Sequence, residues 1–207
     1  MITTFAIFAG GQSRRMGTDK AALTVEGVTL LERTARITLT AGQTALIIGR
    51  TRPDGWPLEA AKFVEDAVPG LGPLGGLHTA LGRHPAVCAL ACDLPLLTPD
   101  AVRWLGAQAE QNNKRGGNEH GLIVVNHGRW EPLFSVYHVA CLPLIESRLT
   151  EGKRSLHGLI EAGDFAFADA PDWVCAQLVN VNTPEDWQTL EDQKRTEDRK
   201  RTGTIDT

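Results

Sequence analysis

The chain has 207 residues, of which 42% are hydrophobic and 22% charged, and its formal net charge is −4. A chain of this length and apolar content can bury one substantial core and is most simply a single domain. The slightly acidic balance argues against a nucleic-acid-binding surface, which is normally strongly basic, and no apolar stretch approaches the roughly 18 residues of a membrane span.

The first half of the chain alternates strand and helix patterns. Residues 4–9 form a short apolar run that is typical of a buried strand. Residues 29–41 are spaced as in a helix, and Gly42 is a stop signal. Further β-rich runs lie at residues 45–48, 63–64 and 86–92, with a short helix at 77–81 and a helix that starts at Thr98–Pro99. This order predicts an α/β fold of three layers, with a mainly parallel mixed sheet covered by helices on both faces.

The second half is less regular. We expect strands at residues 122–125 and 132–137, helices at 142–149 and 155–161, and a short strand in "VNVN" that leads into a helix capped by Thr183, Pro184 and Asp186. No internal repeat or long linker divides the chain. Residues 1–195 are therefore expected to form one domain, and the charged, apolar-poor residues 196–207 to form a disordered tail.

The four cysteines are scattered along the chain, at Cys88, Cys92, Cys141 and Cys175. They lack the paired CxxC or Cys/His spacing of a zinc site, so we interpret them as ordinary reduced core or surface residues. The N-terminus shows neither the basic segment nor the cleavage site of a signal peptide. These features favour a cytoplasmic location.

Glycines and cations gather directly after the first strand, in "AGGQSRRMGTDK". The glycines are Gly10, Gly11 and Gly17, and the cations are Arg14, Arg15 and Lys20. Glycine lets backbone N–H groups approach an oxyanion, and arginine and lysine add charge-assisted contacts. A solvated turn with surface arginines is the simpler alternative, but it does not explain glycines on both sides of the arginines. The loop therefore predicts a polyanionic ligand.

Two well-known phosphate-binding patterns do not explain this loop. A Walker A loop has lysine directly after its second glycine, whereas Lys20 comes three residues after Gly17. The dinucleotide pattern GxGxxG occurs only further on, in "GLGPLG" at residues 70–75. There it does not follow the first strand, and Pro73 lacks a backbone N–H. Asp93 lies at about the expected distance from it, so the pattern stays as a less favoured alternative.

Asp93 ends the apolar run of residues 86–92. Ligands of open α/β sheets bind beyond the carboxyl ends of the strands, and a carboxylate beside a polyphosphate is a suitable ligand for Mg²⁺. The alternative is an aspartate that caps the turn where the strand leaves the core. Because the glycine-rich loop is expected at the same edge of the sheet, we favour the metal ligand.

Four motifs, AGG-x-SRRMG-x-DKA, GPLGGL, ACD-x-P and NVNTPED, span nearly the whole chain. Together they resemble the molybdenum cofactor guanylyltransferases, which are nucleotidyltransferases of the sugar-pyrophosphorylase type. The resemblance implies the Rossmann-like, nucleotide-diphospho-sugar transferase fold with a nucleotide-binding N-terminal half. It also implies Mg²⁺-dependent transfer of GMP from GTP to the terminal phosphate of molybdopterin, release of pyrophosphate, and a transient cofactor-delivery protein as a partner.

The resemblance also assigns site residues by position. Nucleotide contacts are expected from Phe8, Ala9, Gly10, Gly11, Lys20, Asp66 and Asp93. Catalytic roles fall to Lys20, Arg15 and Asp93, with Asp93 as the metal ligand. Asn180 and Asn182 match the paired asparagines thought to face the pterin.

Two positions depart from the family's pattern. Phe8 stands where leucine is common, which is tolerable if only its backbone is used. Gly49 stands where relatives often carry asparagine, so the backbone or a neighbour such as Arg50 must help to select the base. A cytidylyltransferase acting on molybdopterin or another phosphorylated acceptor, and a non-catalytic nucleotide-binding adaptor, remain the alternatives. An attacking phosphate needs no nucleophilic side chain, so the six histidines are read as incidental.

Overall fold

The computed structural model describes residues 3–9, 24–25, 27–114, 118–181, 183, 185–186 and 188–189. Predictions that concern residues 10–23, residue 182 or the predicted tail lie outside this described part. Among the described residues, no helix combines the length and the hydropathy that a bilayer-spanning segment needs.

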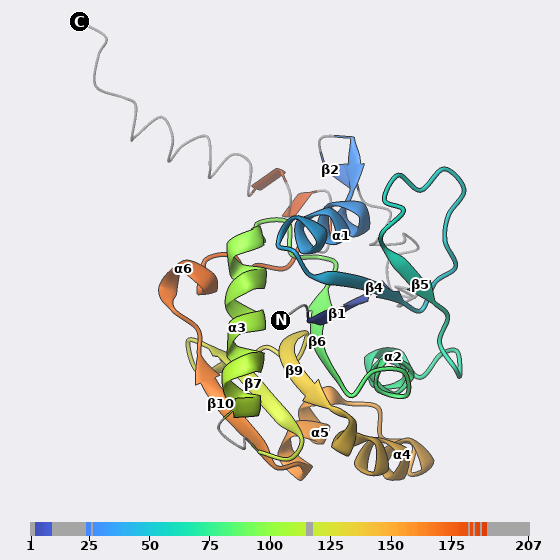
Figure 1. The fold of residues 1–207 in the computed structure, drawn as a ribbon, viewed down its shortest axis with the longest axis vertical. Coiled ribbons are helices and arrows are strands. Elements are labelled where there is room, and N and C mark those ends of the chain that lie inside the picture. The colour runs from blue at the N-terminus through green and yellow to red at the C-terminus, as the bar shows by residue number, and fades with distance from the viewer. Residues whose placement is uncertain are drawn as a thin grey trace, which may run out of the picture.

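A twisted mixed sheet forms the middle of the molecule, with strand order β10-β7-β9-β6-β1-β4-β5 (Figure 1). Strands β1 (Thr4–Phe8), β4 (Thr44–Ile48), β5 (Lys62–Val64) and β6 (Ala86–Ala91) pair in parallel. Strand β9 (Phe134–His138) is antiparallel to β6 and to β7 (Gly121–Asn126), and β10 (Phe165–Asp169) is parallel to β7. The short β8 (Arg129–Trp130) pairs with β7, and β2 (Thr24–Val25) and β3 (Val28–Thr29) form a separate two-stranded sheet. The predicted mainly parallel sheet is confirmed.

Helices cover both faces of this sheet, which gives the predicted three layers (Figure 1). Helices α1 (Leu30–Thr40) and α3 (Pro99–Lys114) lie on one face. Helices α2 (Gly72–Leu81), α4 (Leu142–Thr150) and α5 (Leu156–Ala162) lie on the other. A 3₁₀ turn, η2 (Val139–Cys141), precedes α4, and the short α6 (Asp172–Cys175) follows β10. The single-domain α/β fold is therefore as expected.

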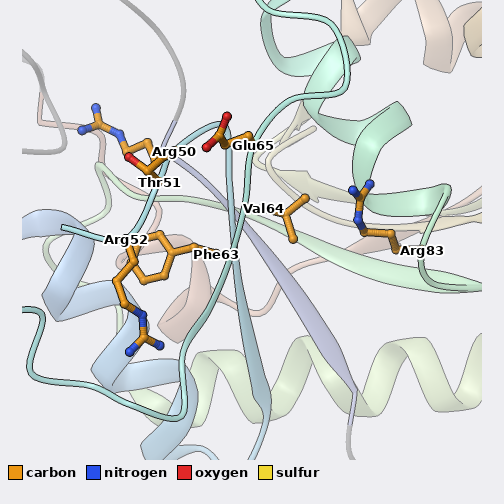
Figure 2. A pocket seen from close by; sticks show the side chains of 7 residues that line it. All are labelled: Arg50, Thr51, Arg52, Phe63, Val64, Glu65 and Arg83. Carbon is orange, nitrogen blue, oxygen red and sulfur yellow. The ribbon is translucent and has the colours of Figure 1, made fainter. Parts of the chain in front are cut away.

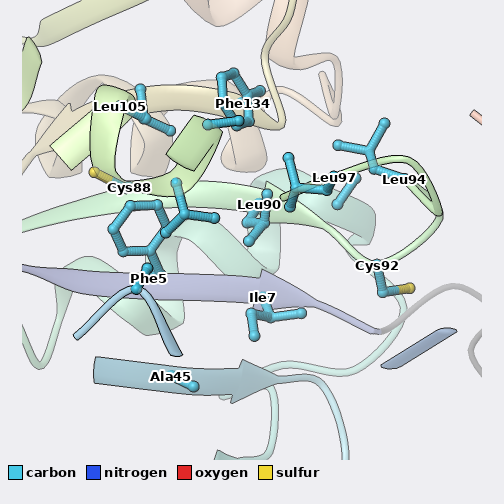
Figure 3. Packing of buried hydrophobic residues seen from close by; sticks show 14 of the residues in the cluster. Phe5, Ile7, Ala45, Cys88, Leu90, Cys92, Leu94, Leu97, Leu105 and Phe134 are labelled. Atoms are coloured by element: carbon cyan, nitrogen blue, oxygen red, sulfur yellow. The ribbon is translucent and has the colours of Figure 1, made fainter. Parts of the chain in front are cut away.

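The central strands send alternate side chains into two cores. Phe5 and Ile7 of β1 join the core under α1 and α3, whereas Ala6 and Phe8 join the core under α2, α4 and α5. Figure 3 shows the first core, in which Phe5 and Ile7 lie near Leu90 of β6. Because both faces are covered, these strands appear in the sequence as continuous apolar runs rather than as alternating ones.

Local hydrogen bonds and a glycine define several helix ends. The Thr29 hydroxyl accepts a hydrogen bond from the Glu32 N–H at the start of α1, and Gly42, with φ 77°, follows the helix. Thr183 and Asp186 exchange two hydrogen bonds, in which the Thr183 N–H donates to the Asp186 carboxylate and the Asp186 N–H donates to the Thr183 hydroxyl. This is the reciprocal arrangement that the "NTPED" stretch predicts.

Two sequence predictions need correction. Helix α2 begins at Gly72 rather than at residue 77, because Pro73 fits the first turn of a helix, where no N–H is needed. Residues 179–181 form no strand, since the segment is held to the sheet edge by the Val181 N–H bond to the Asp93 carbonyl and not by a ladder. Strand β10 was not anticipated.

None of the four cysteines forms a disulfide, in agreement with the interpretation as reduced residues, and all four are buried. Burial raises the pKa of the Cys141 thiol to about 12, and it raises the pKa of Cys88 even further. Buried thiols in this state are packing residues rather than nucleophiles.

Candidate nucleotide-binding site at the carboxyl edge of the sheet

Four parallel neighbours, in the order β6-β1-β4-β5, end at the same edge of the sheet. The residues that follow these strands are Asp93 after β6, Ala9 after β1, Gly49 and Arg50 after β4, and Asp66 after β5. Crevices beyond the carboxyl ends of parallel strands are where open α/β sheets bind ligands. The predicted residues Ala9, Asp66 and Asp93 therefore lie along one edge.

Phe8 presents only its backbone to this edge. Its side chain is 8% exposed and packs against helix α2 at Gly76. A Cβ at Gly76 would lie 3.0 Å from Phe8 Cε1 and 3.1 Å from Ile48 Cγ2, so the phenylalanine fits because glycine stands opposite it. This contact gives the second glycine of "PLGG" a packing role that sequence reasoning missed. The departure from leucine at position 8 is thus accommodated in the core.

Arg50 connects the ends of β4 and β1. Its Nε–H donates a 2.6 Å hydrogen bond to the carbonyl oxygen of Ala9, and the Ala9 N–H donates to the Ile48 carbonyl at 3.3 Å. Gly49 has φ 86°, in the left-handed region that glycine adopts without strain, and its N–H donates to the Val64 carbonyl at 2.9 Å. The chain thus leaves the end of β4 at Gly49 on the side of β5, whereas the Arg50 side chain reaches back to the end of β1.

Asp66 carries a carboxylate oxygen without a partner. Its Oδ1 is buried and accepts no hydrogen bond from the described residues, and burial raises the pKa of this carboxyl above its ordinary value of 3.8. The next residue is fixed to α2, because the Ala67 N–H donates to the Thr79 hydroxyl at 3.0 Å and this hydroxyl donates to the Gly75 carbonyl. An acceptor of this kind, fixed at a ligand-binding edge, is suited to a donor from a bound molecule.

Asp93 and Asn180 are brought together by the backbone. The Val181 N–H donates a 2.9 Å hydrogen bond to the Asp93 carbonyl oxygen, which places the exposed Asn180 beside the end of β6. The structure thus joins a residue predicted for the metal with a residue predicted for the second substrate. The partner position Asn182 lies outside the described residues, as do Gly10, Gly11, Arg15 and Lys20, so their assigned roles stay predictions.

The donor chemistry at this edge suits a hard dication. Asp66 and Asp93 offer carboxylate oxygens, although β5 and β6 are three strands apart, or about 14 Å from strand spacing. This separation of the strands favours different roles for the two carboxylates. Within the described part of the chain, no three His, Cys, Asp or Glu side chains are grouped to hold a metal ion. Magnesium commonly binds through one or two carboxylates together with water and substrate phosphates, and Asp93 fits that pattern.

A hollow of about 510 Å³ lies beside this edge, around the end of β5 (Figure 2). Its lining residues are Arg50, Thr51, Arg52, Phe63, Val64, Glu65 and Arg83. Arg52 donates to the carbonyls of Glu59 and Ala61 and lies over the Phe63 ring, and Arg83 donates to the Thr79 carbonyl. Arg52 thus stabilises the loop before β5, and Arg83 stabilises the end of α2. We therefore assign both arginines a structural role at the rim of the site.

Comparison with known proteins decides the family. The model of the MobA-like NTP transferase domain matches residues 5–166, which is most of the chain. The chain belongs to this family. It is therefore a nucleotidyltransferase, as the sequence motifs predict.

Relatives of the same kind cover nearly the full length. A protein of Synechococcus elongatus named "Probable molybdenum cofactor guanylyltransferase" is 35% identical over 195 residues, covering 89% of this chain and 96% of its own. One of Opitutus terrae with the same name is 32% identical over 191 residues, covering 87% and 91% respectively.

Solved structures confirm the fold. The molybdopterin-guanine dinucleotide biosynthesis protein A of Archaeoglobus fulgidus superposes with a TM-score of 0.74 at 21% identity, covering 94% of this chain and all of that one. The 2-C-methyl-D-erythritol 4-phosphate cytidylyltransferase of Thermus thermophilus superposes with a TM-score of 0.61 at 17% identity, covering 92% and 98%. The nucleotidyltransferase fold is thus shared with enzymes of different base and acceptor preference.

Proposed function

We propose that this chain transfers GMP from Mg²⁺-bound GTP to the terminal phosphate of molybdopterin and releases pyrophosphate. The observation that carries the proposal is the shared edge, where Ala9, Asp66 and Asp93 follow three parallel strands and Asn180 is held beside Asp93. The family match and the names of the curated relatives support the guanine nucleotide and the molybdopterin acceptor.

The reaction forms one bond and breaks another at the α-phosphorus of GTP. An oxygen of the acceptor phosphate forms the new P–O bond, and the bond to the departing pyrophosphate breaks. The attacking phosphate is already anionic near neutral pH, so no side chain has to remove a proton. The protein's task is to align the two phosphates and to neutralise the charge that develops.

The residues of the edge divide this task. Lys20 and Arg15, in the glycine-rich loop that follows Ala9, would neutralise the departing pyrophosphate, and the Gly10 and Gly11 amides would contact phosphate oxygens. Asp93 would hold the Mg²⁺, which supplies charge stabilisation to the phosphates when it is bound. Asp66 follows a strand three positions away from β6 in the sheet, and its unpaired oxygen would accept a hydrogen bond from a donor of the nucleoside. Asn180 and Asn182 would face the pterin.

A cytidylyl transfer is the second candidate, because Gly49 provides no side-chain amide for a guanine. One assay separates the two reactions. Purified protein, Mg²⁺ and molybdenum cofactor are incubated with each of the four nucleoside triphosphates, and pyrophosphate release is measured. The proposal predicts the highest kcat/KM with GTP, whereas a comparable value with CTP would replace it by the second candidate. Binding of GTP without release would indicate a non-catalytic adaptor.

The setting of the reaction is also part of the proposal. We also propose a transient cofactor-delivery protein as a partner. A cytoplasmic location agrees with four free, buried cysteines. A pull-down of soluble extract with the purified chain, with and without GTP, tests whether such a partner binds.

A further inference from the structure

The last carbonyl group at the end of strand β1 accepts its hydrogen bond from a side chain rather than from the backbone of a neighbouring strand. Strands β1 and β4 run parallel with Phe8 opposite Ile48, and the Ala9 N–H continues the ladder by donating to the Ile48 carbonyl. In a regular parallel ladder, the Ala9 carbonyl would next accept from the backbone N–H of residue 50. Here the Nε–H of Arg50 donates to this carbonyl at 2.6 Å.

Gly49 makes this arrangement feasible. Its left-handed conformation, with φ 86°, turns β4 away from β1, and its own N–H pairs with the Val64 carbonyl of β5. The Arg50 backbone is thereby carried off the line of β4, while its long side chain still reaches across to Ala9. Gly49 therefore sets the position of the turn. The Arg50 side chain then provides the Ala9 carbonyl with a donor in place of the backbone N–H of residue 50.

We propose that Arg50 is a positioning residue, whose guanidinium fixes the peptide unit of Ala9 and thereby the direction in which the chain enters the nucleotide-binding loop. A peptide unit is planar, so holding its carbonyl orients the whole unit. The donor is a cation, which makes the hydrogen bond stronger than one between neutral groups. This inference rests on the proposed function, because it assumes that the segment after Ala9 binds the nucleotide.

Arg52 provides a matched control. It also donates to a backbone carbonyl at 2.6 Å, that of Ala61, and it lines the same hollow. Its head group, however, lies over Phe63 and holds the loop before β5, whereas Arg50 points in another direction (Figure 2). The two arginines thus make similar contacts, but only Arg50 is bonded to the end of β1.

The test compares Arg50→Ala, Arg50→Lys and Arg52→Ala in the full chain, by thermal unfolding, by Mg²⁺–GTP binding and by steady-state kinetics. We expect Arg50→Ala to raise the KM and the Kd for GTP about tenfold and to change kcat by less than about threefold. Arg50→Lys, which keeps a charged donor, should recover part of the loss. Arg52→Ala should lower the melting temperature but leave the KM within about twofold of the wild type.

Two results would overturn the inference. One is an unchanged KM in Arg50→Ala, and the other is a fall in its melting temperature as large as that of Arg52→Ala, with kcat reduced as much as the affinity for GTP. If the wild type binds Mg²⁺–GTP without turnover, the proposed function fails, and the Kd of Arg50→Ala alone decides the positioning role. A wild type that binds no nucleotide contradicts both.

Discussion

The backbone N–H of Val181 donates a 2.9 Å hydrogen bond to the carbonyl oxygen of Asp93. This contact attaches the C-terminal "NVNTPED" segment to the end of β6, although the two stretches are far apart in the sequence. The asparagine expected to face the pterin and the carboxylate expected to hold Mg²⁺ consequently lie at one place on the sheet edge. A phosphate-to-phosphate transfer requires that its two substrates meet in this way.

Replacing Asp93 should change the metal requirement. Asp93→Asn is nearly isosteric, and the Asp93 bond to Val181 uses the backbone carbonyl, so the fold should persist. A neutral amide oxygen is a poorer ligand for a hard dication than a carboxylate, so the Mg²⁺ concentration for half-maximal activity should rise about tenfold or more. A metal titration of pyrophosphate release measures this. A curve that overlays the wild type would mean that Asp93 is structural.

Replacing Lys20 should slow turnover without unfolding the protein. The lysine lies in a glycine-flanked, polar stretch of the sequence, where it is not expected to pack in the core. Loss of a charge-assisted contact to a developing polyanion costs about 2–4 kcal/mol of transition-state stabilisation, or roughly a hundredfold or more in rate. Lys20→Ala is measured by kcat, with the melting temperature as the control. Near wild-type turnover would remove this loop from the phosphate site.

The buried carboxylate of Asp66 should lower the stability of the ligand-free protein at neutral pH. Burial raises the pKa of Asp66 in the folded chain above 3.8, so the folded state holds the proton more tightly than the unfolded state. The contribution of this carboxyl to stability is complete at pH values below 3.8 and is lost as the pH rises through the raised pKa. Asp66→Asn removes the charge and should therefore raise the melting temperature of the ligand-free protein at pH 7.

The same Asp66→Asn variant should bind GTP less tightly, because the Asp66 carboxylate is the proposed acceptor for a nucleoside donor and a neutral amide oxygen accepts a weaker hydrogen bond. We expect about tenfold weaker GTP binding. Melting temperatures with and without Mg²⁺–GTP, measured across pH, show both effects. A variant that is less stable at pH 7 than the wild type, and no different at binding GTP, would assign Asp66 a structural role instead.

Replacing Gly76 by alanine should lower the stability of the fold. A Cβ there would lie 3.0 Å from Phe8 Cε1 and 3.1 Å from Ile48 Cγ2, so these buried side chains or α2 itself would have to shift by a few tenths of an ångström. Gly76→Ala should therefore cost about 1–3 kcal/mol of unfolding free energy, measured by denaturant unfolding.

Gly106 is the matched control for this substitution, because it also lies in a helix and a Cβ there would be 3.7 Å from its nearest neighbour, Gln43 Nε2. Gly106→Ala should stabilise the protein by about 0.5–1 kcal/mol through helix propensity. Equal stabilities of the two variants would show that the contact between α2 and β1 is looser than this structure has it.

Gly49→Asn should sharpen the preference for GTP. The residue has φ 86°, and asparagine is the side chain other than glycine that adopts the left-handed region most readily. The new amide can add one hydrogen bond to the base, worth about 0.5–1.5 kcal/mol, or a several-fold change in the ratio of kcat/KM between GTP and CTP. Gly49→Ala provides the control that lacks the amide. An identical ratio in the asparagine and alanine variants would place base selection elsewhere.

Parallel topology made much of the site predictable from sequence. Asp66 and Asp93 each follow a β-rich run, and the ends of parallel strands meet at one edge, so their common location needs no knowledge of side-chain packing. The end of helix α1 was equally predictable, because Gly42 is a local stop signal that acts on the backbone beside it.

Contacts between distant residues were not predictable in this way. The Arg50 bond to Ala9 joins positions 41 apart, and neither hydrophobic periodicity nor a turn motif encodes it. Strand β10 lies at the edge of the sheet with Phe167 54% exposed, so its pattern does not resemble the buried runs of the other strands. The segment ending at Val181 has the composition of a strand, but its described residues form no ladder, and the Val181 N–H donates to the Asp93 carbonyl instead.

Competition among nucleotides tests the central claim most directly. The purified chain, Mg²⁺ and molybdenum cofactor are incubated with an equimolar mixture of the four nucleoside triphosphates, and the dinucleotide products are separated and identified by mass. The proposal predicts the guanine dinucleotide as the main product. Comparable amounts of the cytosine dinucleotide would contradict the guanylyl assignment, and the absence of any dinucleotide, despite bound nucleotide, would contradict the transfer itself.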